Sequence, residues 1–248
     1  VRRRLPTPAT VDQWNLDKSL AFYKDRFADA SDFTFVFVGS VEADTLRPLV
    51  ERYLASLPSL RRKETWKDVG VRAPTGAIVK TVEKGTEPKS QTAIVFTGPF
   101  EYNQTQRVVI RAMAQVLEAR LVEAIREELG GTYSIDARAE HSRVPRQEYS
   151  ISIQFGSDPA RVDALVARVF QEIERLKVTG PAAGHIGEVK LALLRDFEIN
   201  SKSNSYVLDQ MAFRYQHGED VEALWDVPKY YEKLDAFTIR EAARKYLD

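Results

Sequence analysis

The alternation of apolar and polar residues predicts β-strands in this chain, most clearly over residues 147–155. There Tyr149, Ile151, Ile153 and Phe155 take every second position, and the residues between them are mostly polar. One apolar face and one polar face favour an antiparallel sheet that is covered on a single side. Further runs rich in aromatic and β-branched residues predict strands at 33–38, 77–83, 90–97 and 132–139.

Helical periodicity fills most of the remaining chain. Apolar residues spaced by three and four predict helices at 10–27, 42–55, 103–129, 184–202, 203–217 and 238–247, and another that begins after Asp158. Start signals are read at Thr10 with Gln13, at Thr238 with Glu241, and at Asp158 before Pro159. The glycine pair Gly130-Gly131 ends the long helix, since glycine adopts the left-handed conformation at low cost.

The order of the predicted elements divides the chain into three segments. Residues 1–57 hold a helix, a strand and a second helix, too few elements for a core of their own. Residues 58–76 contain prolines and a charged run with little periodicity, which is typical of a linker. Residues 77–248 hold two pairs of strands, each followed by helices, so the fold class is α+β with an antiparallel sheet. If the helix and strand near the N-terminus are repeated at the end, a terminal strand has been trimmed after Asp248 or is short and disordered.

Composition excludes several functional classes. The 248 residues carry 36 basic and 36 acidic side chains, so no charge excess points to nucleic acid or to an acidic tail. Cysteine is absent, which excludes disulfides, thiolate metal sites and a cysteine nucleophile. No apolar run reaches the roughly 18 residues that a membrane-spanning helix needs. The chain begins with Val1 rather than Met, which suggests that it was cut from a longer polypeptide.

The histidines argue against a zinc site in this chain. Hydrolytic zinc needs three protein ligands and an open position, and His141, His185 and His217 are the only histidines. His185 and Glu188 are three residues apart, a spacing that can place two ligands on one helix face. The second helical histidine of H-E-x-x-H or H-x-x-E-H is absent, so an exposed histidine near a helix start explains His185 better. We expect neither catalytic nor metal-binding residues here.

The segment from Arg126 to Ser134 could bring two hydrogen-bond donors together. Arg126 lies in the last turn of the long predicted helix, and Tyr133 is the second residue of the next strand. The glycine pair between them folds the chain back, so a guanidinium and a phenol hydroxyl can meet and bind a peptide carbonyl or an oxyanion. A structural role is the alternative. Arg126 would then favour the negative end of the helix dipole, and Tyr133 would share the buried face of Ile135.

The same segment resembles the Arg-…-Gly-x-x-Tyr-Ser signature in the non-catalytic half of the insulinase and pitrilysin (M16) family of zinc metallopeptidases. Other stretches resemble the family in the expected order, at 22–41, 54–58, 91–99 and 179–188. Together they cover nearly the whole chain, and the ordered set is more specific than any one of them. The family's catalytic H-x-x-E-H has no match here.

This resemblance implies a catalytically inactive last domain at 77–248 with the LuxS/MPP-like metallohydrolase fold, and the end of a preceding domain at 1–57. It also implies that zinc sits in the N-terminal catalytic half of the same polypeptide. Arg126 and Tyr133 would hold the backbone of a peptide substrate that the two halves enclose. Bacterial long-form relatives are often exported, so we expect the periplasm, with the cytoplasm left open. The alternative is a non-enzymatic subunit of the same fold, used for assembly or protein binding.

Overall fold

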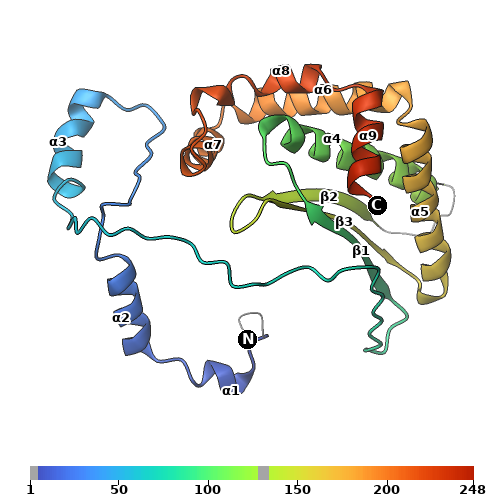
Figure 1. The fold of residues 1–248 in the computed structure, drawn as a ribbon, viewed down its shortest axis with the longest axis horizontal. Coiled ribbons are helices and arrows are strands. Elements are labelled where there is room, and N and C mark those ends of the chain that lie inside the picture. The colour runs from blue at the N-terminus through green and yellow to red at the C-terminus, as the bar shows by residue number, and fades with distance from the viewer. Residues whose placement is uncertain (1–4, 128–133) are drawn as a thin grey trace. The chain divides into compact units, whose positions relative to one another are not determined.

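The structure, a computed structural model, describes residues 5–127 and 134–248. The chain divides into two compact units, Val1–Thr65 and Trp66–Asp248. This division falls inside the segment 58–76, where the sequence predicts a linker. In Figure 1 the first unit contains helices α1 to α3, and the second contains the sheet with the helices that cover it.

The helices of the first unit are α1 (Pro8–Val11), α2 (Leu16–Arg26) and α3 (Ala43–Tyr53), and polar side-chain caps begin α1 and α2. The side chain of Asn15 accepts a hydrogen bond from Lys18 N at 2.9 Å and begins α2. Thr7 and Thr10 form the capping box of α1. The single helix predicted over 10–27 is therefore wrong in its first part, because a second cap interrupts it.

The segment 33–38 does not form the predicted strand, although its aromatic and β-branched residues favour one. None of residues 5–65 is in a strand, so the segment has no neighbour with which to exchange backbone hydrogen bonds. Phe35 and Phe37 are about half exposed as a result. The helix predicted at 42–55 is confirmed by α3, because a helix makes its hydrogen bonds within itself.

A buried carboxylate links two parts of the first unit that are distant in the sequence. Among residues 5–65, Asp29 alone is buried from solvent. It accepts hydrogen bonds from the backbone N–H groups of Ser31, Leu60 and Arg62 at 3.0, 2.8 and 2.6 Å. Burial opposes its ionisation, but these bonds, that from Arg62 first, hold the pKa of Asp29 below its ordinary value. The bonds fasten the end of the unit to the loop after α2.

Residues 5–65 bury no apolar side chain, so the aromatic residues of this unit lie on its surface. They include Trp14, Phe22, Tyr23, Phe27, Phe35, Phe37 and Tyr53. Large exposed apolar patches bind partners or hydrophobic dyes. We therefore expect the purified chain to raise the fluorescence of anilinonaphthalene sulfonate and to self-associate in sedimentation velocity.

The double substitution Phe22→Ser with Phe37→Ser should weaken both effects. Phe237→Ser is the matched control, because Phe237 is similarly exposed but belongs to the second unit. A monomeric chain that leaves the dye dark would contradict the expectation.

The second unit is built on an antiparallel sheet in which β1 (Ser90–Pro99), β3 (Glu148–Ser157) and β2 (Ile135–Ser142) lie side by side in that order (Figure 1). Ile153 of β3 lies opposite Ile94 of β1 and Ala137 of β2. The alternating apolar residues of β3 are buried on one face. The strands predicted at 90–97 and 147–155 are confirmed, and the one predicted at 132–139 begins at Ile135.

The strand predicted at 77–83 is also wrong. Ile78, Val79 and Val82 are exposed, and the segment makes no strand pairing within the described part of the chain. Its residues favour a strand, but β-structure needs a partner as well as a preference. Among the strands of the described residues, β1 pairs with β3 alone, so the outer side of β1 is an edge there.

Helices lie on one face of this sheet. α4 (Gln104–Leu121) and α9 (Ala236–Tyr246) pack on the strands, and α5 (Val162–Thr179), α6 (Ala183–Asn200) and α8 (Val227–Glu232) pack on α4. α7 (Asn204–Gln216) follows α6 in the chain. α4 packs directly on the strands, and its Ile110, Met113 and Leu117 form a solvent-free core with Ile151 and Ile153 of β3. The α+β class with an antiparallel sheet and helices on one face is therefore confirmed. Within residues 5–127 and 134–248, no helix combines the length and apolar character needed to cross a membrane.

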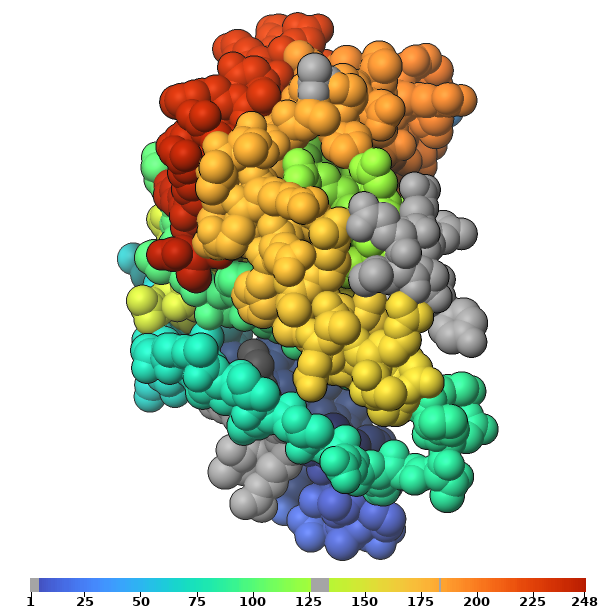
Figure 2. Space-filling view, turned by 90° about the vertical axis from the view of Figure 1, so that its right-hand side faces the viewer, coloured from blue at the N-terminus to red at the C-terminus, as the bar shows by residue number. Residues whose placement is uncertain are grey.

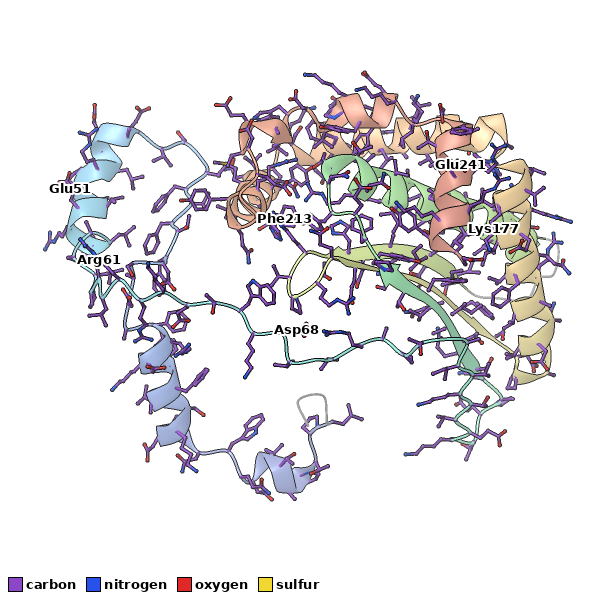
Figure 3. The ribbon with its side chains drawn as sticks, in the orientation of Figure 1. Glu51, Arg61, Asp68, Lys177, Phe213 and Glu241 are labelled. Atoms are coloured by element: carbon purple, nitrogen blue, oxygen red, sulfur yellow. The ribbon has the colours of Figure 1, made fainter. Side chains whose placement is uncertain are left out.

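α9 closes the core by packing against α4 and α5. Figure 2 shows the gold surface of α5 beside the red surface of α9, and Figure 3 labels Lys177 and Glu241 on these two helices. Arg244 Nε donates to the carbonyl oxygen of Lys177 at 2.8 Å. The hydroxyl of Tyr246 donates to Gln106 Oε1 at 2.7 Å, and burial raises the pKa of Tyr246 to about 12.

Two predicted helix starts have different outcomes. Asp158 is a cap as predicted, since its carboxylate accepts from Ala160 N at 2.8 Å and begins a short 3₁₀ turn, Pro159–Arg161, before α5. Thr238 is not a cap. Asp235 takes that role by accepting from Thr238 N at 2.7 Å, because an aspartate three residues earlier offers the stronger acceptor. The helices predicted at 184–202 and 203–217 are confirmed by α6 and α7.

Candidate functional site

The candidate donor pair lies where α4 ends and β2 has yet to begin. α4 passes into a π-helix, Val122–Glu127, which contains Arg126. The side chain of Arg126 and all of residues 128–133, including Tyr133 and the glycine pair, lie outside the described residues. The approach of the two side chains therefore stays a prediction. The structure describes the π-helix before this segment and β2 after it, which begins at Ile135.

The sequence predicts one regular helix as far as residue 129, but the structure has a π-helix at Val122–Glu127. The chain is α-helical to Leu121 and then widens into the broader turn. π-Helical turns are rare, since they have poorer backbone geometry than an α-helix, and they occur frequently at functional sites. The turn contains Arg126, which favours a functional role for the segment between α4 and β2 that carries the candidate pair, here called the candidate corner.

A buried carboxylate fixes α5 to the last turn of α4 below the corner. The side chain of Glu172 is 4% exposed. It pairs with Arg120 of α4 at 2.9 Å, and with Arg175 and Arg168 of its own helix at 2.9 and 3.3 Å. Arg120 also donates to the carbonyl oxygen of Gly180 at 3.3 Å. Because Arg120 lies in the last turn of α4, this cluster fixes the chain directly before the π-helix.

The structure places His185 against the π-helix. His185 lies in the first turn of α6, with its Nε2 3.5 Å from Glu123 Oε2. The side chain is 24% exposed, so the prediction of a histidine near a helix start is correct and that of its full exposure is wrong, because His185 packs beside the π-helix. Glu188 is exposed. Among the residues described, no group of three or more His, Asp or Glu side chains could hold a metal ion.

Sequence reasoning did not find two carboxylates near the candidate corner: Glu172, which pairs with Arg120, and Glu123, which lies beside His185. One signal for Glu172 was available, because Arg168 and Arg175 stand at helical spacings of four and three from it. The contact between Glu123 and His185 has no such local signal, since the two residues belong to different helices.

Comparison with known proteins gives a family match over most of the chain. The model described as the peptidase M16 inactive domain matches residues 13–193. The chain is 25% identical over 185 residues to the probable zinc protease PqqL of Haemophilus influenzae, an alignment that covers 71% of this chain and 20% of that protein. It spans 20 to 26% of the length of the curated relatives it matches.

Solved structures share the fold. The crystal structure of the periplasmic protease PqqL from Escherichia coli superposes with a TM-score of 0.85 at 23% identity, over 99% of this chain and 27% of that one. A peptidase M16 inactive domain from Pseudomonas fluorescens gives a TM-score of 0.69 at 16% identity, over 97% and 57% of the two chains. With the family model matched over more than half of its residues, the chain belongs to the peptidase M16 inactive-domain family.

Proposed function

We propose that this chain is the C-terminal, catalytically inactive part of a zinc-dependent M16 metalloendopeptidase, in which it helps to enclose and bind the peptide substrate. The observation that carries the proposal is the match to an inactive peptidase domain in a sequence without H-x-x-E-H. Relatives named as zinc proteases are four to five times as long as the part they share with this chain, which supports a larger enzyme.

In this proposal the zinc belongs to the N-terminal catalytic half of the same polypeptide. Bound zinc supplies a polarised carbonyl and an activated water. This chain holds the substrate instead, with Arg126 and Tyr133 donating hydrogen bonds to the peptide backbone near the scissile bond. The description of Escherichia coli PqqL as a periplasmic protease supports the same compartment for this protein.

The alternative, a non-enzymatic subunit used for assembly or protein binding, makes a different demand on the sequence. Such a subunit needs the fold and its surface, but it has no use for a guanidinium and a phenol aimed at a scissile bond. The presence of both Arg126 and Tyr133 in the family pattern favours the peptidase.

Purified alone, the 248-residue chain is expected to bind no stoichiometric zinc and to cleave no peptide. The expectation follows from the missing ligands, and metal analysis by mass spectrometry with a fluorogenic peptide assay measures both. The full-length protein, tested in parallel, should carry zinc and lose its cleavage activity to a chelator. Equimolar zinc in the short chain would contradict the proposal. A full-length protein without zinc or cleavage would favour the assembly subunit.

A further inference from the structure

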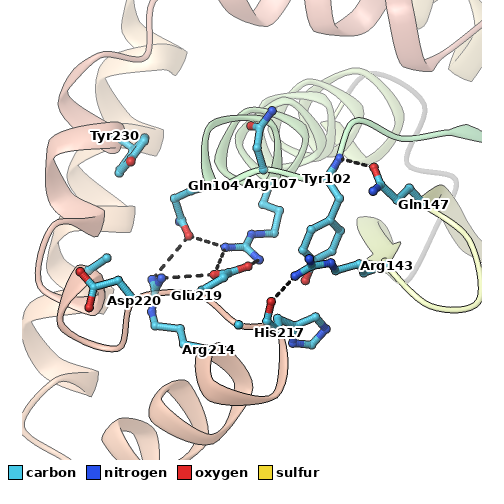
Figure 4. Close-up of a pocket in the computed structure, with 13 residues that line it drawn as sticks. Tyr102, Gln104, Arg107, Arg143, Gln147, Arg214, His217, Glu219, Asp220 and Tyr230 are labelled. Carbon is cyan, nitrogen blue, oxygen red and sulfur yellow. Dashed lines mark hydrogen bonds and ion pairs between the residues drawn. The ribbon is translucent and has the colours of Figure 1, made fainter. Parts of the chain in front are cut away.

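A second polar region lies at the opposite end of α4 from the candidate corner. It is a pocket of about 400 Å³ (Figure 4). The start of α4, the β2–β3 hairpin, the loop after α7 and α8 line it. Small-molecule sites range from about 300 to 1,000 Å³, so this pocket suits a small group or a short part of a longer ligand.

Two buried guanidinium groups in its wall share one carboxylate. The side chains of Arg107 and Arg214 are 7% and 4% exposed. Arg107 donates to both oxygens of Glu219, at 2.6 and 2.7 Å. Arg214 lies 3.4 Å from Glu219 and 3.4 Å from Gln104, and its Nε has no hydrogen-bond partner in the described part of the chain. Normal N–H···O bonds measure about 2.7–3.2 Å, so Arg214 keeps unused donor capacity.

The lining carries more positive than negative charge. Arg143 reaches the pocket from the hairpin and donates to the carbonyl oxygen of His217, so three guanidinium groups face two carboxylates, Glu219 and Asp220. Asp220 is exposed and accepts from a backbone N–H of the following turn. Arg143 is exposed, whereas Arg214 is buried and shares Glu219 with Arg107, so an added anion beside Arg214 would offset the cost of burying its charge.

Glu219 already contributes its negative charge to this balance, so it cannot offset the remaining positive charge. Burial raises the pKa of Glu219, but the hydrogen bond and charge of Arg107, together with the charge of Arg214, outweigh it and hold the pKa below its ordinary value. Glu219 is therefore fully ionised at neutral pH. Aromatic rings fix the geometry around it, with Arg107 4.9 Å from the ring centroid of Tyr102, which stacks on His217 at 5.7 Å.

We propose that this pocket binds a carboxylate ligand, with Arg214 and Arg143 as its donors and the Arg107–Glu219 pair as a fixed wall. The planar fork of a guanidinium matches a carboxylate in two parallel hydrogen bonds. Glu219 shows that a carboxylate fits among these groups. The carboxylate can come from a peptide C-terminus or from an acidic side chain. The proposal goes beyond the peptidase function and does not use Arg126 or Tyr133.

Calorimetric titration of the 248-residue chain at low salt tests the proposal with three probes. They are acetylated trialanine with a free C-terminus, the same peptide amidated, and amidated acetyl-Ala-Asp-Ala. The free acid should bind saturably and the amidated trialanine at least about tenfold more weakly, since a hydrogen bond to a charged group is lost. Binding of the aspartyl peptide as well would show that any carboxylate suffices, whereas its failure would assign the site to a peptide terminus.

Arg143→Gln should weaken binding of the free acid about tenfold or more, and Arg146→Gln should leave it unchanged. Arg146 is the matched control because it is exposed on the same hairpin and pairs with Glu148 at 3.3 Å, outside the pocket. Arg214→Gln should abolish binding, with circular dichroism reporting its fold; if it is unfolded, Arg143→Gln decides. Absence of saturation with every carboxylate at millimolar concentration would overturn the proposal. Equal affinity in Arg143→Gln, or tighter binding of inorganic phosphate, would do the same.

Discussion

Arg126→Ala in the full-length protein is expected to lower kcat/KM for peptide cleavage by tens of times or more. One donor aimed at a developing oxyanion contributes about 10²–10³ in kcat, and a donor to a substrate carbonyl acts in the same direction. The proposed zinc site lies elsewhere in the polypeptide, so the zinc content should not change. Steady-state kinetics with a fluorogenic peptide, combined with metal analysis, separates these two effects.

Tyr133→Phe removes only the hydroxyl group and should give a loss of similar size. Arg138→Ala is the matched control, because Arg138 is an exposed arginine on β2 that pairs with its neighbour Asp136 at 2.8 Å. If Arg126→Ala and Tyr133→Phe both keep the kinetics of the unaltered enzyme, the two residues have a structural role at the end of the helix.

Glu172→Ala is expected to lower the free energy of unfolding by about 3–5 kcal/mol, the usual cost of leaving a buried charge without its partner. The substitution removes a carboxylate that is 4% exposed and takes this ion-pair partner from the guanidinium of Arg120, which is 14% exposed. Urea denaturation, followed by circular dichroism, measures the loss as a lower midpoint.

Glu174→Ala provides the control on the same helix. Its carboxylate is 64% exposed and pairs with Lys177 at 2.9 Å, and exposed pairs of this kind contribute at most about 1 kcal/mol. Equal denaturation midpoints for the two variants would show that the Glu172 cluster does not hold α5 against α4.

The elements that could be predicted are those in which the sequence pattern of the segment itself determines which residues are buried or form a cap. The alternation in β3 assigns its buried face, and Asp158 caps the turn that it directly precedes. The strands expected at 33–38 and 77–83 fail for the opposite reason. Their residues favour extended backbone, but a strand depends on hydrogen bonds to a neighbouring segment, and the sequence of one segment does not reveal its neighbour.

The same limit applies to the sites. The motif around Arg126 and Tyr133 is continuous in sequence, so it can be read without a structure. Glu172 meets Arg120 across 52 residues, and Arg107 meets Glu219 across 112. No local pattern links such pairs. The pocket at the start of α4 is lined by segments that are distant in the sequence, so it could be found only in the structure.

The π-helix affects the direction in which the chain leaves the end of α4. Each residue added to or removed from a helix turns the following chain around the helix axis, by about 100° in an α-helix and by less in the wider π-helical turn. The number of residues in the segment Val122–Glu127, as much as their chemistry, therefore determines the direction of the backbone at the end of this helix.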